Sequence, residues 1–153
     1  MLDSTLLIRY LLLKHMKILA IDPGEKKIGI AISDELGISA KPLAVIKHIQ
    51  REKDAEQVAA IAAEKGAELI IVGQSLDEDG KPTFTGRKSA RFAKALRTKT
   101  EIPVKLWDEF RSTQIARETR IKMGVSRKKR GGHLDDIAAA VILQSYLETI
   151  DNF

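Results

Sequence analysis

The sequence contains no cysteine, and aromatic residues are few. Without a thiol, a disulfide framework, a thiolate zinc site and a cysteine nucleophile are all excluded, and residence in a reducing cytosol fits that absence. The chain has two tyrosines, one tryptophan and four phenylalanines, and no strand pattern is rich in them. Base stacking on an aromatic sheet surface, as in RNA-recognition domains, is therefore disfavoured.

The chain also lacks a long hydrophobic run. Residues 6–13 form an apolar stretch that Arg9 interrupts, far short of the roughly 18 apolar residues that span a bilayer. Asp3 stands where a signal peptide would carry basic residues. We therefore expect a protein that does not associate with membranes.

The length of 153 residues suits one domain with a single core. A second methionine, Met16, stands directly before the first clear strand. We expect residues 1–15 to be an extension outside the core, with a short amphipathic helix as the alternative, and residues 16–150 to form the domain.

Basic residues outnumber acidic ones. Lys and Arg total 26 against 21 Asp and Glu, which gives a formal net charge of +5 and a pI near 9.5. Such a balance favours a polyanionic partner such as nucleic acid. Net charge is weak evidence alone, so the positions of the cations matter more.

The hydrophobic pattern predicts strands first and then an alternation of helices and strands. An apolar run at 18–21, a turn at Pro23-Gly24, and runs at 28–32 and 42–46 predict an antiparallel meander of three strands. The later elements are expected at 54–65 (helix), 69–72 (strand), 87–97 (helix), 104–107 (strand), 113–123 (helix) and 135–150 (helix). This order predicts one α/β domain with a mixed five-stranded sheet flanked by helices.

Carboxylates stand where these elements begin or end. Asp22 ends the first strand, Glu109 follows the fifth, and Asp135 and Asp136 open the last helix. If the first and fifth strands lie near the middle of the sheet, these acids can converge. Converging carboxylates repel one another until a cation binds, and hard oxygen ligands favour Mg²⁺ or Mn²⁺ over zinc.

Each acid alone has an ordinary structural explanation. Asp22 before Pro-Gly suits a turn, Glu109 suits an exposed loop, and an acid such as Asp135 or Asp136 caps many helices. Only their combination favours a metal site.

Cations and glycines accompany the acids along the chain. The candidate phosphate-binding residues are Arg87, Lys88 and Arg91 on one helix and Arg127, Lys128, Lys129 and Arg130 in a loop just before the last helix. A solvated surface is the alternative for both groups. Gly73, Gly80 and Gly86 would allow a backbone to approach phosphate, although such glycines more often satisfy turn geometry.

Four motifs stand in order along the chain. They are ILAIDPG at 18–24 with GIAISD at 29–34; IVG at 71–73 with glycines further on; WDE at 107–109 with ST at 112–113; and LDDIAA at 134–139 with ILQSYL at 142–147. This arrangement, from Met16 to the C-terminal region, resembles the YqgF family, also called RuvX, in the RuvC-like branch of the RNase H-like superfamily.

The resemblance implies an RNase H-like fold in which Asp22, Glu109 and Asp135 form the catalytic, metal-binding cluster. It implies a nuclease that matures the 5′ end of pre-16S rRNA in ribosome biogenesis, so structured RNA is favoured over branched DNA and the ribosome is a candidate partner. Alternatives are a Holliday junction resolvase acting on four-way DNA and a non-catalytic RNA-binding assembly factor. An actin-like phosphotransferase is disfavoured because it needs two lobes.

The chain departs from the family pattern at two positions. Phe110 follows the glutamate where the family usually has arginine, so Arg111 becomes the candidate phosphate-binding arginine, displaced by one residue. Ser75 stands where proline is common. Both departures concern substrate geometry more than the acidic cluster.

Overall fold

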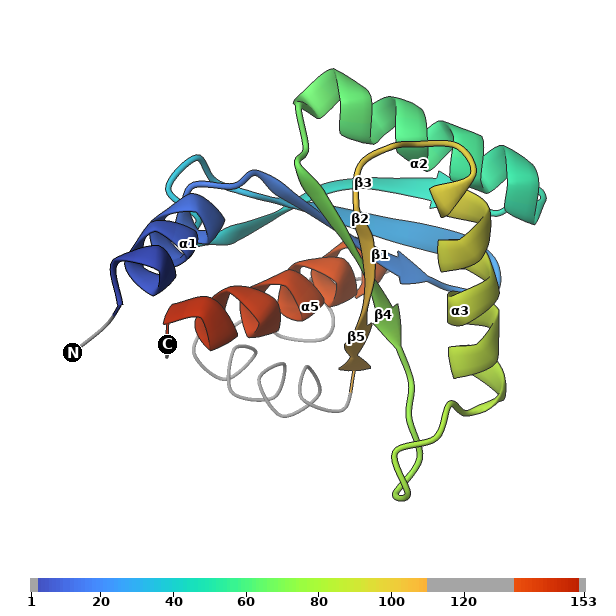
Figure 1. The fold of residues 1–153 in the computed structure, drawn as a ribbon. Helices are drawn as coiled ribbons and strands as arrows, with labels where there is room; N and C mark the ends of the chain where they lie inside the picture. Colours follow the sequence, from blue (N-terminus) through green and yellow to red (C-terminus); the bar gives the residue numbers. More distant parts are fainter. Residues whose placement is uncertain (1–2, 110–133, 152–153) are drawn as a thin grey trace.

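A five-stranded sheet forms the centre of the protein. The structure is a computed structural model that describes residues 3–109 and 134–151. The strands lie in the spatial order β3-β2-β1-β4-β5 (Figure 1). Their bounds are β1 (Ile18–Pro23), β2 (Lys27–Ser33), β3 (Ala40–Lys47), β4 (Leu69–Gln74) and β5 (Val104–Asp108).

Helices cover both faces of this sheet. The described helices are α1 (Ser4–Lys14), α2 (Arg51–Lys65), α3 (Phe84–Arg97) and α5 (Leu134–Asp151). Helices α2 and α3 lie on one face and α5 on the other (Figure 1). The expected α/β architecture with a mixed five-stranded sheet is thus confirmed, while the helix expected at 113–123 lies outside the described residues.

The strand directions gather four strand ends at one edge. β2 is antiparallel to both β1 and β3, whereas β4 is parallel to β1 and β5. Strands β1, β3, β4 and β5 therefore run the same way, and we call the side where they end the carboxyl edge. The condition that the first and fifth strands lie near the middle of the sheet is met by β1, which is central, but not by β5, which is an edge strand.

Two hydrophobic cores fix which side of the sheet each residue faces. Leu19 and Ile21 belong to the core beneath α2 and α3, while Ile18 and Ala20 pack with residues of α5. This alternation is the period of two expected of a strand buried on both faces. If this alternation continues for one more residue, the side chain of Asp22 lies on the α5 face of the sheet.

Two helices begin earlier than their sequence patterns predict. α3 begins at Phe84 because the Thr83 side chain accepts a hydrogen bond from the Gly86 amide at 3.1 Å. α2 begins at Arg51, which places Asp54 inside its first turn, where its side chain is buried. The local hydrogen bond that begins α3 is invisible to hydrophobic periodicity, whereas the N-cap residue of α2, Gln50, makes no side-chain cap hydrogen bond.

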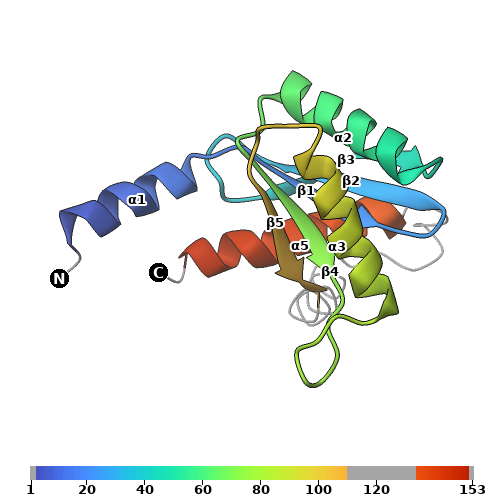
Figure 2. The ribbon, with the colours of Figure 1, turned by 45° about the vertical axis from the view of Figure 1, so that its right-hand side comes forward.

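Helix α1 extends away from the sheet (Figure 2). Its apolar side chains Leu6, Leu7, Ile8 and Leu11 are 40% to 58% exposed. Met16, by contrast, packs against the core beneath α5. Among the described residues, no helix combines the length and apolarity needed to cross a bilayer. The helical alternative is correct for this segment, and its position outside the domain stays a prediction.

We expect a protein that begins at Met16 to keep its thermal midpoint within about 2 °C, since little apolar area leaves water when α1 is present. Melting curves of the full chain and the shortened chain provide the measurement. The matched control is the full chain with Met16→Ser, which loses the core contact of the Met16 side chain and should melt lower. A large fall in the thermal midpoint on removal of residues 1–15 alone would show that α1 stabilises the domain.

Candidate active site

Two predicted acids meet at the carboxyl edge. The sheet register places Ile21 of β1 beside Val72 of β4, and Gly73 of β4 beside Trp107 of β5. Asp22 follows Ile21, and Glu109 lies two residues beyond Trp107. The side chains of the two acids are hydrogen-bonded to each other, although β4 separates their strands.

Gly73 leaves the space through which Glu109 reaches across β4. A β-carbon on Gly73 would lie 2.8 Å from Glu109 Oε1 and 2.6 Å from Ile142 Cδ1. Both distances are shorter than real β-carbon contacts, so any side chain at this position would displace both atoms. The glycine therefore makes room for a carboxylate.

The other two predicted phosphate-binding glycines also have conformational explanations. Gly80 adopts a φ of 78° in a turn, and its amide donates to the Asp77 carbonyl at 3.0 Å. A β-carbon on Gly86 would lie 2.0 Å from the Ser75 carbonyl oxygen, so α3 packs too closely on the preceding loop for a side chain. Turn geometry and close packing explain these glycines without a phosphate.

The end of β5 is anchored on helix α5. Trp107 Nε1 donates to Ser145 Oγ at 3.0 Å, and the ring of Trp107 packs edge-on against Tyr146 with centroids 5.1 Å apart. These contacts hold the end of β5 in place, and with it the backbone of Glu109, two residues after Trp107. The Glu109 side chain therefore lies over Gly73 of β4, where it reaches Asp22.

Burial and the adjacent carboxyl groups raise the pKa of Glu109. Desolvation is the largest cause, followed by the charge and hydrogen bond of Asp22 and the charge of Asp108, and together they bring the pKa to about 7. Two carboxyl groups that hydrogen-bond to each other must share a proton. The metal-free pair therefore binds a proton. A divalent cation would neutralise more of the negative charge of the two carboxylates.

The position of the third predicted acid is described only through its backbone. Asp135 and Asp136 lie in the first turn of α5, and their side chains lie outside the description. Within the described residues, no three His, Asp or Glu side chains are grouped to hold a metal. The roles of Asp22, Glu109, Asp135 and Asp136 as metal ligands stay predictions.

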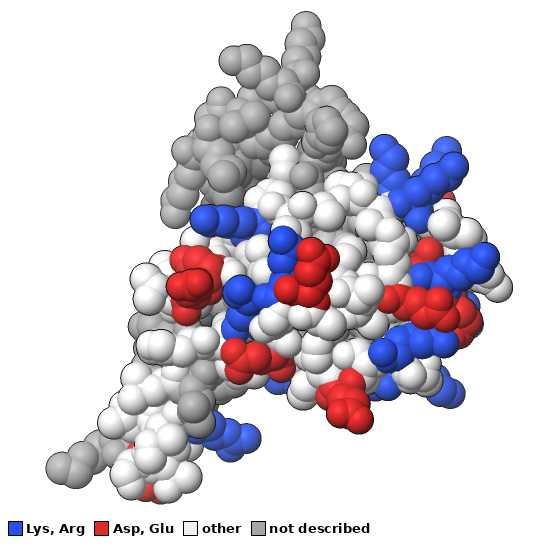
Figure 3. Space-filling model, turned by 90° about the horizontal axis from the view of Figure 1, so that it is seen from above, with Lys and Arg blue, Asp and Glu red and all other residues white. Residues whose placement is uncertain are grey.

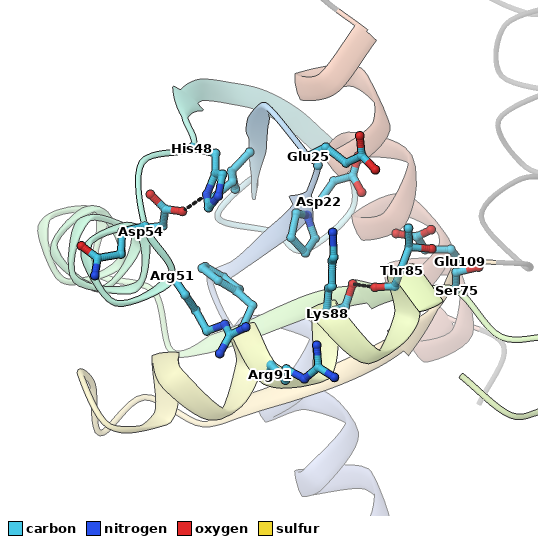
Figure 4. A pocket seen from close by; sticks show the side chains of 16 residues that line it. Asp22, Glu25, His48, Arg51, Asp54, Ser75, Thr85, Lys88, Arg91 and Glu109 are labelled. Carbon is cyan, nitrogen blue, oxygen red and sulfur yellow. Dashed lines mark hydrogen bonds and ion pairs between the residues drawn. The ribbon is translucent and has the colours of Figure 1, made fainter. Parts of the chain in front are cut away.

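A cavity of about 610 Å³ extends from this acid pair toward α2 and α3. One end carries the acids Asp22, Glu25 and Glu109 (Figure 4). The other end carries the side chains of His48, Arg51, Asp54 and Arg91. The cavity thus joins a site suited to a cation and a site suited to an anion, which is what a phosphodiester and its metal require.

Two of the three cations predicted on α3 line this cavity. Lys88 and Arg91 do so, and Lys88 extends toward the Asp22 side of the cavity (Figure 4). Arg87 does not line it, because its Nη1 donates to the Pro82 carbonyl at 3.2 Å and its guanidinium lies 5.8 Å from the centroid of Phe84. The remaining predicted cations, Arg111, Arg127, Lys128, Lys129 and Arg130, lie outside the described residues.

Three polar residues of the cavity were missed by sequence reasoning. His48 comes directly after β3, Arg51 begins α2, and Asp54 lies in the first turn of that helix. A signal was present, because the third strand of an antiparallel meander runs parallel to the first and ends at the same edge. By this argument His48, the residue after the third strand, could have been predicted to lie at the same edge as Asp22.

The net positive charge is not gathered on the face above α2. Figure 3 shows basic and acidic side chains interspersed over that view of the molecule. Lys99 of this region makes ion pairs with Glu52 at 3.7 Å and Glu56 at 3.5 Å. On this face, the described cations therefore do not form one continuous basic patch.

We expect Gly73→Ala to lower the pKa of Glu109 from about 7 toward its ordinary value, because the new β-carbon displaces the carboxylate from Asp22. Stability should fall by only about 1 kcal/mol, since both obstructing atoms end flexible side chains. Carboxyl NMR titration measures the pKa, and urea unfolding measures the stability.

Ile142→Val is the matched control, because it removes the Cδ1 atom and leaves Glu109 in place. Added to Gly73→Ala, it should regain stability without restoring the pKa. A pKa that stays at about 7 in the Gly73→Ala protein would contradict the role given to this glycine.

Comparison with known proteins connects this geometry to a family. The family model described as RuvX, Holliday junction resolvase, matches residues 16–149. A protein of Desulforamulus reducens, named "Putative pre-16S rRNA nuclease", is 41% identical over 134 residues, 88% of this chain and 98% of its own length. A protein of Geobacillus kaustophilus with the same name is 42% identical over 136 residues, 88% of this chain and 99% of its own.

Solved structures show the same fold at low sequence identity. RuvC of Thermus thermophilus in complex with a Holliday junction substrate superposes with a TM-score of 0.60 at 18% identity, covering 90% of this chain and 97% of RuvC. The fowlpox virus Holliday junction resolvase gives a TM-score of 0.52 at 20% identity, covering 88% and 99%. The predicted RNase H-like fold is therefore confirmed, and the chain belongs to the RuvX family.

Proposed function

We propose that this protein is a metal-dependent nuclease that hydrolyses phosphodiester bonds in structured RNA, with the 5′ leader of pre-16S rRNA as its substrate. The observation that carries the proposal is the proton-sharing pair of Asp22 and Glu109 at one end of a cavity whose other end is cationic. Phosphodiester hydrolysis needs both features, because the reacting phosphate and the attacking oxygen are negatively charged.

The pair fits a divalent cation of the magnesium type. Its donors are carboxylate oxygens, which Mg²⁺ and Mn²⁺ prefer, and its partial burial makes two uncompensated charges costly. Asp22 and Glu109 would hold the ion, and binding would displace their shared proton. When bound, such an ion polarises a phosphate oxygen and lowers the pKa of a coordinated water.

Asp135 is the expected third ligand. It precedes Ile142 by seven residues, which is about two turns of helix and returns to nearly the same face. Ile142 is the residue of α5 whose Cδ1 closes on Gly73. Position 135 is therefore expected on the same stripe of α5 as Ile142, whereas position 136 would be rotated about 100° away.

The cavity residues have separate roles in this proposal. Lys88, which extends toward the Asp22 side, would neutralise the reacting phosphate, and Arg91 would hold the adjoining backbone. Ser75 and Thr85 add hydroxyl groups that can donate to phosphate oxygens.

The choice of RNA is supported by the names of the relatives in Desulforamulus reducens and Geobacillus kaustophilus. The description of the family model names Holliday junction resolution instead. A four-way DNA junction is therefore the second candidate substrate. Both candidates use the same acids and the same phosphodiester chemistry.

Replacing each acid by its amide should abolish Mg²⁺-dependent cleavage of pre-rRNA 5′-leader RNA, by about 100-fold or more, since the amide nearly keeps the shape but removes the charge that holds the metal. The variants are Asp22→Asn, Glu109→Gln and Asp135→Asn. Cleavage rates are measured across a magnesium titration, with melting curves to show that each variant folds.

Asp136→Asn is the internal control and should keep more activity than Asp135→Asn. A four-way DNA junction is offered in parallel under the same conditions. Cleavage of the junction with the RNA left intact would overturn the substrate assignment. Normal cleavage by all four variants would overturn the nuclease mechanism, and RNA binding without cleavage in the parent protein would favour an assembly factor.

The raised pKa of Glu109 predicts a specific pH dependence of stability. A carboxyl group whose folded pKa lies above its unfolded value stabilises the protein below about pH 4.5 and loses that contribution as pH rises through about 7. In EDTA, Glu109→Gln should therefore gain about 1–2 kcal/mol over the parent protein between pH 5.5 and pH 8, after allowance for solvent screening.

Urea unfolding at the two pH values tests this, with Glu25→Gln as a control for loss of a carboxylate elsewhere in the cavity. Added Mg²⁺ should stabilise the parent protein more at pH 8 than at pH 5.5, because it competes with the shared proton. An equal effect of Glu109→Gln at both pH values would mean that the pair does not share a proton.

A further inference from the structure

A histidine and a buried aspartate form a second polar group at the carboxyl edge. His48 directly follows β3, one of the four strands that end there, and its backbone amide donates to the Lys26 carbonyl at 2.9 Å. Its Nδ1 is hydrogen-bonded to Oδ2 of Asp54 in the first turn of α2 (Figure 4). Both residues line the cavity that contains Asp22 and Glu109.

Asp54 fixes the orientation of the histidine. Its side chain is 1% exposed, and its Oδ1 accepts a hydrogen bond from the Ile49 amide at 3.0 Å. A carboxylate only accepts hydrogen bonds, so Nδ1 of His48 carries the proton. The ring nitrogen left for the cavity is Nε2, which no described residue contacts by a hydrogen bond, and the side chain of His48 is 43% exposed.

Cations without acidic partners line the same cavity as this nitrogen. Arg51 and Arg91 lie at the same end of the cavity as His48, and Lys88 extends toward the Asp22 side. None of the three makes an ion pair with an acid in the described part of the chain. The nearby acids of α2, Glu52 and Glu56, are instead paired with Lys99. The only acid placed at this end of the cavity, among the residues described, is Asp54, which is committed to His48 and Ile49.

We propose that His48, Arg51 and Arg91 form a binding site for a phosphate group of the nucleic acid other than the one being cleaved. On binding, His48 takes up a second proton from solvent, so that Nδ1 donates to Asp54 while Nε2 donates to a phosphate oxygen. Arg51 and Arg91 neutralise the phosphate from α2 and α3. This inference rests on the proposed nuclease function and adds a positioning site to it.

The role of such a site is to set where the strand enters the active site. A nucleic-acid strand carries a phosphate on every nucleotide, so a phosphate held at the α2 end of the cavity determines which neighbouring phosphate reaches Asp22 and Glu109. Phosphate contacts of this kind fix register without reading sequence. The bound group is either an internal phosphodiester or the terminal phosphate of a chain.

Phosphate binding can be tested without any cleavage. The protein is labelled with ¹⁵N at histidine, kept in EDTA, and titrated with inorganic phosphate and then with short oligoribonucleotides that carry either a 5′-phosphate or a 5′-hydroxyl. We expect the His48 Nε2 resonance to shift in a saturable way, and the relative affinity of the two oligonucleotides separates a terminal phosphate from an internal one. An unmoved His48 resonance in all three titrations would overturn the proposal.

Matched variants separate binding from a structural role of the pair. His48→Asn keeps a donor for Asp54 but removes the atom at Nε2, and Arg51→Gln removes a cavity cation. Each should weaken oligonucleotide binding by on the order of tenfold, as expected for one charge-assisted contact. Lys53→Gln removes the same charge from an exposed position of α2 outside the cavity and should bind almost as the parent does.

The same titrations in the Asp22→Asn background keep the two proposals apart. Binding at His48 should survive there, since the acid pair is not part of this site. If His48 responds to phosphate but the parent protein cleaves nothing, the binding site stands and the nuclease proposal fails. If the parent cleaves RNA while His48→Asn and Arg51→Gln bind it as tightly as Lys53→Gln does, the binding site is wrong.

Discussion

The carboxyl groups of Asp22 and Glu109 hydrogen-bond to each other across a strand that belongs to neither of them, and the local structure is arranged around that contact. Two charged carboxylates in a partly buried position repel, so the metal-free protein retains a proton there, at a pKa of about 7 for Glu109. A divalent cation satisfies the same pair better than a proton. The arrangement is thus costly for the metal-free fold, and it is where we propose that this member of the RuvX family binds a metal ion.

Strand direction explains how one edge collects the whole site. Because β1, β3, β4 and β5 end together, their last residues and the loops that follow supply the acids, the histidine and the starts of α2 and α3. The two faces of the sheet contribute different groups to the site. The acid pair belongs to the α5 side, where Ile142 packs near Gly73, while the cations come from α2 and α3.

The sequence predicts the strands, the layers and the acid positions, because apolar runs bounded by turns and acids report directly on buried strands. It does not reveal that β5 is an edge strand or that Gly73 makes the space for Glu109, since both depend on packing between segments distant in the chain. The start of α3 was misplaced for a different reason, because it depends on the local hydrogen bond between Thr83 and Gly86. His48 and Asp54 look like ordinary surface residues until the fold places β3 beside β2 at the shared edge.

The central claim is that Asp22 and Glu109 bind a divalent cation between them. Crystals grown or soaked with Mn²⁺, with diffraction measured near the manganese absorption edge, test it most directly. The account predicts an anomalous difference peak within coordination distance of both carboxylates, and the loss of that peak in Glu109→Gln crystals. Manganese bound elsewhere in the cavity, for example at His48 and Asp54, with no peak at the acid pair, would contradict it.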